Sequence, residues 1–366
     1  MKAFFLSVVL LAALDCKMQS QASTSVSGGF TPGELRSFTA LEPIDTHTHV
    51  RRADPAFNAM LDRLHVHLLD IILVDDLDPE ERNLQSEREN AVAFIRSSKG
   101  HAVLCTTIDP YKIGSPDFAA SAIRDLDNDF ANGAVAVKLW KNVGMEIRDA
   151  KGNYIFPNDP ALAPIYRAIA AHNRTLVAHV ADPDSAWAPL DPASPDYSYY
   201  SQHSEWYMHD KANVPSKERI LAARDHVLDQ NPKLRVVGAH LGSMEASLSA
   251  LADHLDRYPN FAVDLASRVP YLALAPRDQA IEFILKYQDR LIYATDLTLQ
   301  ASDHAIDAKI RTWEETYARE WRFLATNETV QFETVKAQGL ALPNSVLRKI
   351  YHDNAVRWFP GIIPSR

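Results

Sequence analysis

Short apolar runs alternate with longer amphipathic stretches from about residue 41 onward. Eight of these runs have the length and the β-branched content of buried strands, and they cover residues 43–50, 69–74, 102–108, 134–140, 175–180, 234–241, 261–266 and 290–296. Helical periodicity between them is clearest at residues 160–172, 216–230, 244–257 and 277–287. Strands that alternate with helices indicate βαβ units and a parallel sheet. Eight such units predict an α/β fold of the (β/α)8 TIM barrel type.

Two connections in this pattern are too long for simple turns. Residues 181–215 follow the fifth predicted strand and contain several prolines and a cluster of aromatic residues. Residues 297–343 follow the eighth strand and include a helical stretch near 305–324. Long loops in compact enzymes are usually lids or added surface elements. Because both follow a strand, we expect both at the C-terminal face of the barrel, and we expect a C-terminal helix at 344–359.

The first residues have a separate pattern. A short positive start precedes twelve mostly apolar residues at 3–14, too few to span a bilayer and typical of a signal peptide. Cys16 and a polar stretch follow, which resembles a bacterial lipoprotein leader with Cys16 as the lipidated residue. Cleavage after Ala22 is the alternative, and a buried N-terminal helix is a third interpretation. We predict a leader at 1–22, a linker at 23–40 and one barrel domain at 41–366.

This organisation predicts export to the periplasm of a bacterium, or anchoring there through a lipid, with no transmembrane span in the mature chain. Removal of Cys16 would leave Cys105 alone, so we expect no intrachain disulfide. The formal net charge is −9 and no basic stripe is visible, which argues against nucleic acid as a partner. We expect a small-molecule substrate, and a homodimer is compatible with the sequence.

The chain has fourteen histidines, and strand position separates them. Catalytic groups of TIM barrels lie at the C-terminal ends of the strands. Four histidines end a predicted strand, namely His47, His49, His179 and His240. His203 and His209 lie in the loop after strand five. We expect the other eight to be structural or at the surface: His65, His67, His101, His172, His226, His254, His304 and His352.

The pair His47 and His49 is separated by one residue, which places both side chains on one face of a strand. His65 and His67 have the same spacing but precede their apolar run. His179 ends strand five, and Asp296 ends strand eight. Three imidazoles and a carboxylate suit Zn²⁺, while Mn²⁺ or Fe²⁺ is not excluded. Asp296 alone would be read as a helix cap or an ion-pair partner; beside three histidines at matching positions we predict a metal ligand.

These residues together resemble the amidohydrolase superfamily. The motifs are Asp45-Thr-His-Thr-His49, Val177-Ala-His179, Val237-Gly-Ala-His-Leu-Gly242 and Tyr293-Ala-Thr-Asp296. The sequence is most similar to the amidohydrolase-related branch, which includes aminocarboxymuconate-semialdehyde decarboxylase and other aromatic-acid decarboxylases. The C-terminal segment from Leu342 to Ala355 also resembles this branch. The resemblance covers roughly residues 41–360.

The resemblance implies a role for each motif residue. His47 and His49 would be the strand-one ligands, His179 the strand-five ligand and Asp296 the strand-eight ligand. His240 would match a strand-six histidine that contacts metal-bound water or substrate, which makes His240 and Asp296 the catalytic pair.

Lys138, near the end of strand four, has two interpretations. In some members of the superfamily a carboxylated lysine there bridges two metals. We favour one ion, with an unmodified Lys138 that binds a substrate carboxylate or pairs with a neighbour.

These parts predict a metal-dependent hydrolase of amides, esters or lactones, with water activated by the metal. His240 would act as general base or stabilise an oxyanion. The main alternative is a non-oxidative decarboxylase or hydratase. In that case Arg268, after strand seven, would bind a substrate carboxylate, as could Lys138 or Lys141. Further alternatives are a metal-free lactonase and a binding protein without catalysis.

Aromatic residues near the predicted active-site face could contact substrate or simply pack. We expect an aromatic wall of the substrate pocket, formed by Trp140, Trp206, Tyr207 and His209.

Overall fold

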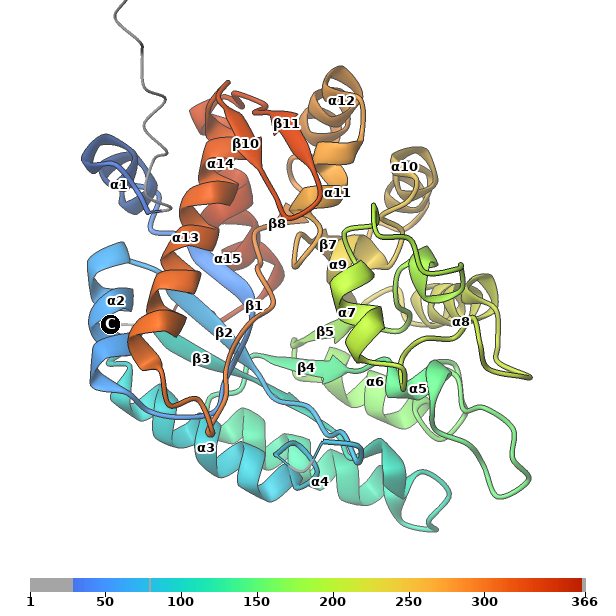
Figure 1. Ribbon diagram of the computed structural model, residues 1–366. Coiled ribbons are helices and arrows are strands. Elements are labelled where there is room, and N and C mark those ends of the chain that lie inside the picture. Colours follow the sequence, from blue (N-terminus) through green and yellow to red (C-terminus); the bar gives the residue numbers. More distant parts are fainter. Residues whose placement is uncertain (1–28, 79, 364–366) are drawn as a thin grey trace, which may run out of the picture.

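The computed structural model describes residues 29–78 and 80–363 and has the predicted barrel architecture (Figure 1). Neighbouring strands pair in parallel in the order β8-β7-β6-β5-β4-β3-β2-β1-β9. Their bounds are β1 Ile44–Val50, β2 His67–Ile71, β3 Ala102–Thr107, β4 Ala136–Leu139, β5 Thr175–Ala178, β6 Arg235–Gly238, β7 Phe261–Asp264, β8 Leu291–Ile292 and β9 Leu297–Leu299.

The eighth predicted strand, residues 290–296, is interrupted and closes the barrel in two parts. β8 pairs with β7, and β9 pairs with β1. Between them, Thr46 N donates to the Tyr293 carbonyl at 3.1 Å, and Asp296 N donates to the His47 carbonyl at 2.8 Å. Asp296 has φ +69°, a left-handed conformation that no strand accommodates and that Asp tolerates better than most residues. The sheet therefore closes on β1 next to Asp296.

Strand β1 contains a bulge that decides which side chains face the barrel interior. Asp45 is paired with Leu68 and Thr48 with Asp70, so three steps along β1 match two steps along β2. Such an extra residue reverses the alternation of faces beyond it. Ile44, before the bulge, lies in the interior apolar cluster at the start of the strand. His47, three residues later, faces the interior as well.

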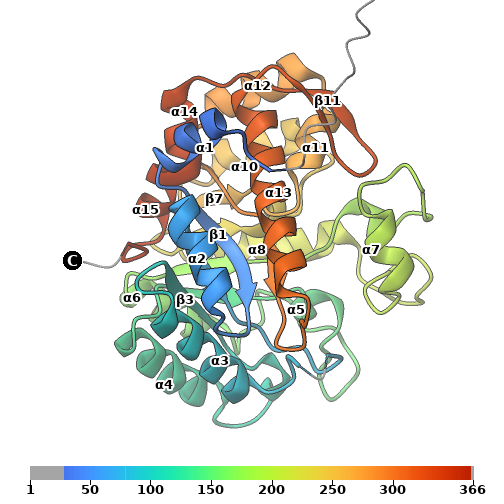
Figure 2. The same cartoon turned by 60° about the vertical axis from the view of Figure 1, so that its left-hand side comes forward.

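Helices surround the barrel on its outer side (Figure 2). Polar residues that cap a helix N-terminus precede several of them, such as Asp54 before α2 and Ser216 before α8. The longer helices are α1 Pro32–Thr39, α2 Pro55–Leu64, α3 Leu84–Ser97, α4 Phe118–Ala131, α6 Ala163–Ala171, α8 Lys217–Gln230, α10 Leu248–Arg257, α12 Arg277–Tyr287 and α13 Ile306–Ala325. Shorter elements are η1 Pro110–Lys112, α5 Asn142–Met145, η2 Asp184–Ala186, α7 Tyr197–Gln202, α9 Ala239–Gly242 and α11 Val269–Leu274.

The predicted C-terminal helix is present in three consecutive parts. They are α14 Asn344–Arg348, a π-helical turn at Lys349–Asp353 and α15 Asn354–Trp358. Trp358 and Phe359 are buried against the apolar residues that begin the strands, including Ile44 and Ala136. This helix therefore closes the N-terminal end of the barrel. A separate, larger apolar cluster fills the space between the strands and the surrounding helices.

The two long connections contain ordered elements of their own. Residues 181–215 include η2 and α7, which project from the barrel in Figure 2, and we call this segment the lid. Residues 297–343 include β9, α13 and a small antiparallel pair, β10 Thr329–Gln331 and β11 Lys336–Gln338.

Within the described residues, no helix has the length and apolar character to cross a membrane. The predicted leader, with Cys16 and Ala22, lies outside the described residues, so its cleavage and lipidation stay predictions.

Candidate metal centre

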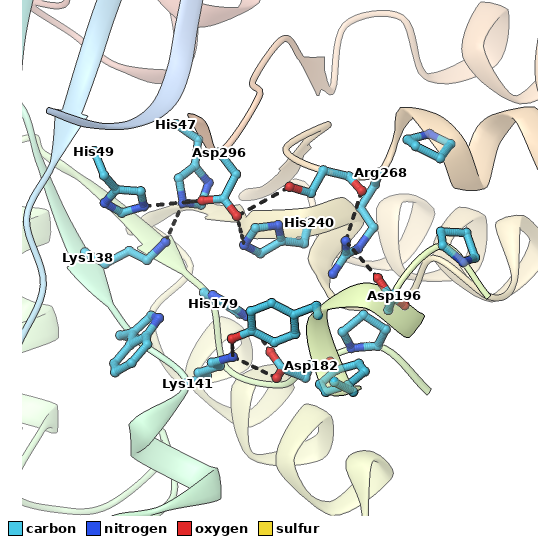
Figure 3. Close-up of a pocket in the computed structure, with 17 residues that line it drawn as sticks. His47, His49, Lys138, Lys141, His179, Asp182, Asp196, His240, Arg268 and Asp296 are labelled. Atoms are coloured by element: carbon cyan, nitrogen blue, oxygen red, sulfur yellow. Dashed lines mark hydrogen bonds and ion pairs between the residues drawn. The ribbon is translucent and has the colours of Figure 1, made fainter. Parts of the chain in front are cut away.

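Three of the four predicted metal ligands converge at the C-terminal end of the barrel. His47, His49 and Asp296 each offer a ligand atom, and these atoms lie within 4.8 Å of one another. Both histidines come from β1, His47 within the bulge and His49 beyond it, and Asp296 comes from the break between β8 and β9. Figure 3 shows the three side chains grouped on one side of the pocket. The prediction that these three residues share one site agrees with this geometry.

The Nδ1 atom of each of these two histidines lies within hydrogen-bond distance of an oxygen atom outside the group of three. The distance from His47 Nδ1 to Asp264 Oδ2 is 3.0 Å, and that from His49 Nδ1 to the Ile71 carbonyl is 2.8 Å. Because a carbonyl only accepts, His49 carries its proton on Nδ1, and a carboxylate fixes His47 in the same way. Both Nε2 atoms are then lone-pair donors facing Asp296 Oδ1, at 3.4 Å and 3.3 Å.

Three acceptor atoms that face one another repel unless a cation lies between them. Two imidazole nitrogens and one carboxylate oxygen are a donor set that divalent transition metals prefer. The residues present therefore fit a divalent metal ion, as expected from the sequence.

The pKa values favour the protonation states that metal binding requires. Burial lowers the pKa of His49 to about 4, so its imidazole is neutral at pH 7. Burial alone would raise the pKa of Asp296, but the imidazoles of His47 and His240 outweigh that effect and hold it well below its usual value. A neutral His49 imidazole and an ionised Asp296 carboxylate are ready ligands, because neither has to lose a proton before a metal binds.

His240 lies beside this group on strained backbone. It follows β6 with φ +59°, and Leu241 and Ser243 are also left-handed. Non-glycine residues in this region cost about 1–3 kcal/mol each and cluster at functional sites. The Asp264 carboxylate accepts a hydrogen bond from His240 N at 2.7 Å, which holds the strained turn. His240 Nδ1 donates to the Ala266 carbonyl at 2.9 Å, and its Nε2 lies 4.0 Å from Asp296 Oδ2.

His179, the fourth predicted ligand, lies in the pocket wall but outside the group of three. Its ring centroid is 4.2 Å from that of His240, and its Nε2 lies 3.1 Å from Asp182 Oδ1. Asp182 is in turn fixed by Lys141, whose Nζ donates to Oδ2 at 2.8 Å. The structure thus orients His179 toward Asp182 at the start of the lid, and its role as a ligand stays a prediction.

Lys138 is fully buried beside the same histidines. Its Nζ lies 2.9 Å from His47 Nε2, and burial lowers its pKa. Its amine therefore contacts a predicted ligand of the metal, and the choice between a carboxylated and an unmodified Lys138 stays a prediction.

The pocket around these groups has a volume of about 280 Å³. Pockets for drug-sized ligands start at about 300 Å³, so a small substrate is indicated. Trp140, Lys141 and Arg268 line it, together with Pro195, Asp196, Tyr199 and Tyr200 of the lid.

The predicted aromatic wall is corrected in part. Trp206 and Tyr207 are buried in the lid and do not line the pocket. Trp206 packs edge-on against Trp140 with centroids 4.9 Å apart, and the Tyr207 hydroxyl donates to the Ala188 carbonyl at 2.8 Å. His209 is exposed, with its Nδ1 2.8 Å from Asp210 Oδ1. The apolar rings stabilise the lid interior instead, and Tyr199 and Tyr200 take the predicted position at the pocket.

Several residues of the site were not predicted from the sequence. Asp264 ends β7 and could have been found by the same strand-end criterion that selected Asp296. Ser267, whose hydroxyl lies 3.4 Å from Asp296 Oδ2, and Asp182 have no comparable signal because they lie in loops. Asp45 begins the first sequence motif, but no role was predicted for it from the sequence. Its carboxylate accepts hydrogen bonds from His47 N at 3.2 Å and from the Thr295 hydroxyl at 2.6 Å, so it joins the bulge to strand eight.

Comparison with one solved structure agrees with the architecture, and a second solved structure also aligns with the chain. An uncharacterized TIM-barrel protein from Bordetella bronchiseptica aligns with a TM-score of 0.52 at 14% identity, over 87% of this chain and 99% of that one. A 2,6-dihydroxybenzoate decarboxylase from Rhizobium aligns with a TM-score of 0.49 at 13% identity, over 87% and 98%. Likeness at such identities concerns the fold alone. No curated protein matches the sequence.

The sequence itself matches a family profile over most of its length. The profile described as amidohydrolase aligns with residues 44–361, from the first residue of β1 to just beyond α15. This span includes both strand-one histidines, Asp296 and the strained turn at His240. The predicted membership is therefore confirmed, and the chain belongs to the amidohydrolase family.

Proposed function

We propose that this protein is a metal-dependent hydrolase that cleaves an amide, ester or lactone bond of a small molecule. The observation that carries the proposal is the convergence of His47, His49 and Asp296 beside His240, whose Nε2 lies 4.0 Å from Asp296 Oδ2. Membership in the amidohydrolase family supports an enzyme of this kind. The pocket volume, about 280 Å³, supports a small substrate.

The donor set supports one divalent ion, most simply Zn²⁺, while Mn²⁺ or Fe²⁺ would also accept these ligands. The single group of three ligand atoms among the described residues supports one ion over two. A divalent ion bound here would lower the pKa of a water ligand from about 15.7 toward about 7.

The chain's own groups then move the proton. The carboxylate of Asp296 orients the attacking water through a hydrogen bond, with Ser267 holding Oδ2 from behind. His240 Nε2, fixed by the Nδ1 contact to Ala266, accepts the proton as the water oxygen bonds to the substrate carbonyl carbon. Protonated His240 returns that proton to the leaving nitrogen or oxygen as the bond to carbon breaks. Protons and electron pairs balance without another reactant.

Metal analysis of the purified protein, before and after chelation, tests the proposal together with a substrate panel of lactones, amides and aromatic acids. We expect turnover with incorporation of ¹⁸O from labelled water into the product, loss of turnover after chelation, and recovery with Zn²⁺ or Mn²⁺. Turnover should also disappear in His179→Ala and Asp296→Ala. Activity that survives complete removal of the metal would contradict a metal-dependent hydrolase and favour a metal-free lactonase.

A second candidate is a non-oxidative decarboxylase or hydratase, and the buried guanidinium of Arg268 in the pocket favours it. Such a cation could orient a substrate carboxylate. Release of CO₂ from an aromatic acid without ¹⁸O incorporation would select the decarboxylase over the hydrolase.

A further inference from the structure

Arg268 has an unusual environment for a buried arginine. It lies directly after β7 at the start of α11, is 7% exposed and lines the pocket. A guanidinium carries five N–H groups. Among the described residues, Arg268 donates one hydrogen bond, from Nη1 to the Ser267 carbonyl at 3.0 Å, and its buried Nε has no acceptor. A buried group this poorly satisfied costs free energy unless a ligand supplies the missing acceptors.

Asp196 of the lid compensates the charge of Arg268 without hydrogen bonding to it. Asp196 Oδ1 lies 3.7 Å from Arg268 Nη1, beyond hydrogen-bond distance. Its Oδ2 accepts hydrogen bonds from the hydroxyls of Ser185 and Tyr271. Burial works against the charge on Arg268, but the carboxylates of Asp196 and Glu245 outweigh that effect and raise its pKa. The guanidinium is therefore cationic, with its donors still available.

Other cations of the pocket are already engaged. Lys141 donates to Asp182 at 2.8 Å and to the Tyr199 hydroxyl at 3.0 Å, and Lys138 is directed at His47. Arg268 is thus the pocket cation with the most unused donors among the described residues.

Arg268 is also close to the metal centre along the chain. Its neighbour Ser267 lies 3.4 Å from Asp296 Oδ2 through its hydroxyl. Figure 3 shows Arg268 and Asp196 across the pocket from His49 and Lys138, with Asp296 and His240 between them. A molecule bound to Arg268 would therefore extend toward the three converging ligand atoms.

We infer that Arg268 binds a carboxylate group of the substrate and that Asp196 is the internal counter-ion with which this carboxylate competes. The substrate class is then a small carboxylic acid whose scissile bond lies a short distance from its carboxylate. The inference rests on the proposed function only in placing the substrate in this pocket. A carboxylate is flat and accepts two parallel N–H bonds, which matches a guanidinium better than an ammonium.

Calorimetric titration of the metal-loaded full chain tests this inference with acetate, succinate and benzoate as probes and benzamide as the neutral counterpart of benzoate. We expect at least one carboxylate to bind more tightly than benzamide. In Arg268→Gln its affinity should fall by roughly ten- to a hundredfold, as for one lost charge-assisted contact, while benzamide binding stays unchanged. The matched control is Arg257→Gln, since the Arg257 side chain is 66% exposed.

Asp196→Asn separates carboxylate recognition from a merely structural contact of the lid. The asparagine still accepts hydrogen bonds from Ser185 and Tyr271, but its charge is gone. A competing counter-ion predicts tighter carboxylate binding in this variant, by roughly threefold or more. A structural lid contact predicts weaker binding of carboxylate and benzamide alike in both variants.

Two results would overturn the inference: no probe carboxylate binds more tightly than benzamide, or Arg268→Gln and Asp196→Asn weaken both probe types equally. The proposed hydrolase is judged separately by metal-dependent turnover. Turnover without Arg268-dependent carboxylate binding would leave the hydrolase standing and refute the inference. Arg268-dependent binding of a carboxylate with no metal-dependent turnover would support the inference and refute the proposed hydrolase.

Discussion

The two ends of the barrel interior are built from the same strands with opposite chemistry. On β4, Ala136 belongs to the apolar cluster at the N-terminal end, and Lys138, two residues on, faces the metal centre. On β7, Ala262 and Asp264 divide in the same way. On these two strands, the side chain nearer the N-terminal end packs, and the one nearer the C-terminal end ionises or binds.

The contrast separates the sources of stability from the sources of function. Apolar burial at the N-terminal end stabilises the fold, with about 1.5–3 kcal/mol for each large side chain. Buried charges at the C-terminal end cost free energy unless they are paired or bind a metal. We therefore expect changes at one end to reduce stability and changes at the other end to reduce activity.

The largest expected effect comes from Asp296→Asn, which keeps the shape of the side chain and removes a ligand charge. Loss of several kcal/mol of electrostatic stabilisation corresponds to about a thousandfold or greater fall in kcat/KM. Bound metal should fall in parallel when measured by mass spectrometry. Thermal unfolding without metal should show only a modest loss of stability, because the lowered pKa of Asp296 means that the folded protein favours its ionised carboxylate. A marked loss of stability would break the contrast between the two ends.

The matching substitution at the other end is Phe359→Ala. Phe359 is fully buried in the apolar cluster, and its removal should cost about 3–5 kcal/mol in the free energy of unfolding. Denaturant unfolding measures this cost. Metal content and kcat at a temperature where the variant stays folded should match the wild type. A lowered metal affinity in the folded variant would show that the two ends are coupled.

Asp264→Asn tests the carboxylate that holds His47 and the His240 backbone in place. Asp264 holds His47 Nδ1 and the strained His240 backbone, and loss of such outer partners typically costs about 10- to 100-fold in metal affinity or activity. Competition with a chelator of known affinity measures the change. Asp129→Asn offers a control, since Asp129 is also buried but pairs with Arg88 away from the pocket. Equal effects of the two substitutions would argue against a specific role for Asp264.

The smallest expected effect concerns Glu320, a buried carboxyl on α13 that accepts a hydrogen bond from the Tyr293 hydroxyl at 2.8 Å. Burial raises its pKa from 4.5 to about 8. Between these two values the folded protein holds a proton that the unfolded chain has released, so stability falls as pH rises. Glu320→Gln removes this dependence, and its stability relative to the wild type should increase by at least about 1 kcal/mol from pH 4.5 to pH 8. Denaturant titrations at several pH values test it, and a parallel pH dependence in both proteins would contradict it.

The sequence predicted the barrel and much of the site because both follow from periodicity. Alternating apolar runs locate strands, and polar residues at the C-terminal ends of parallel strands meet on one face. This criterion predicted from the sequence that His47, His49 and Asp296 lie together. The bulge in β1 could not be predicted, because it is visible only as a change of register against β2. The orientation of His179 depends on Asp182 in the lid, and loop geometry has no comparable period. For the same reason the sequence placed Trp206 and Tyr207 at the pocket, whereas the lid buries them.

The helix that closes the N-terminal end has a consequence for the order in which the protein is made. Ala355, Trp358, Phe359 and Ile362 complete the interior cluster, although they are synthesised after every strand of the barrel. Until they emerge, Ile44 and the other apolar residues that begin the strands have no cover. The base of the barrel in a nascent chain therefore stays uncovered until synthesis has passed Ile362, at about 5–20 residues per second. Termination before Ala355 would release a barrel with an open apolar base that favours aggregation.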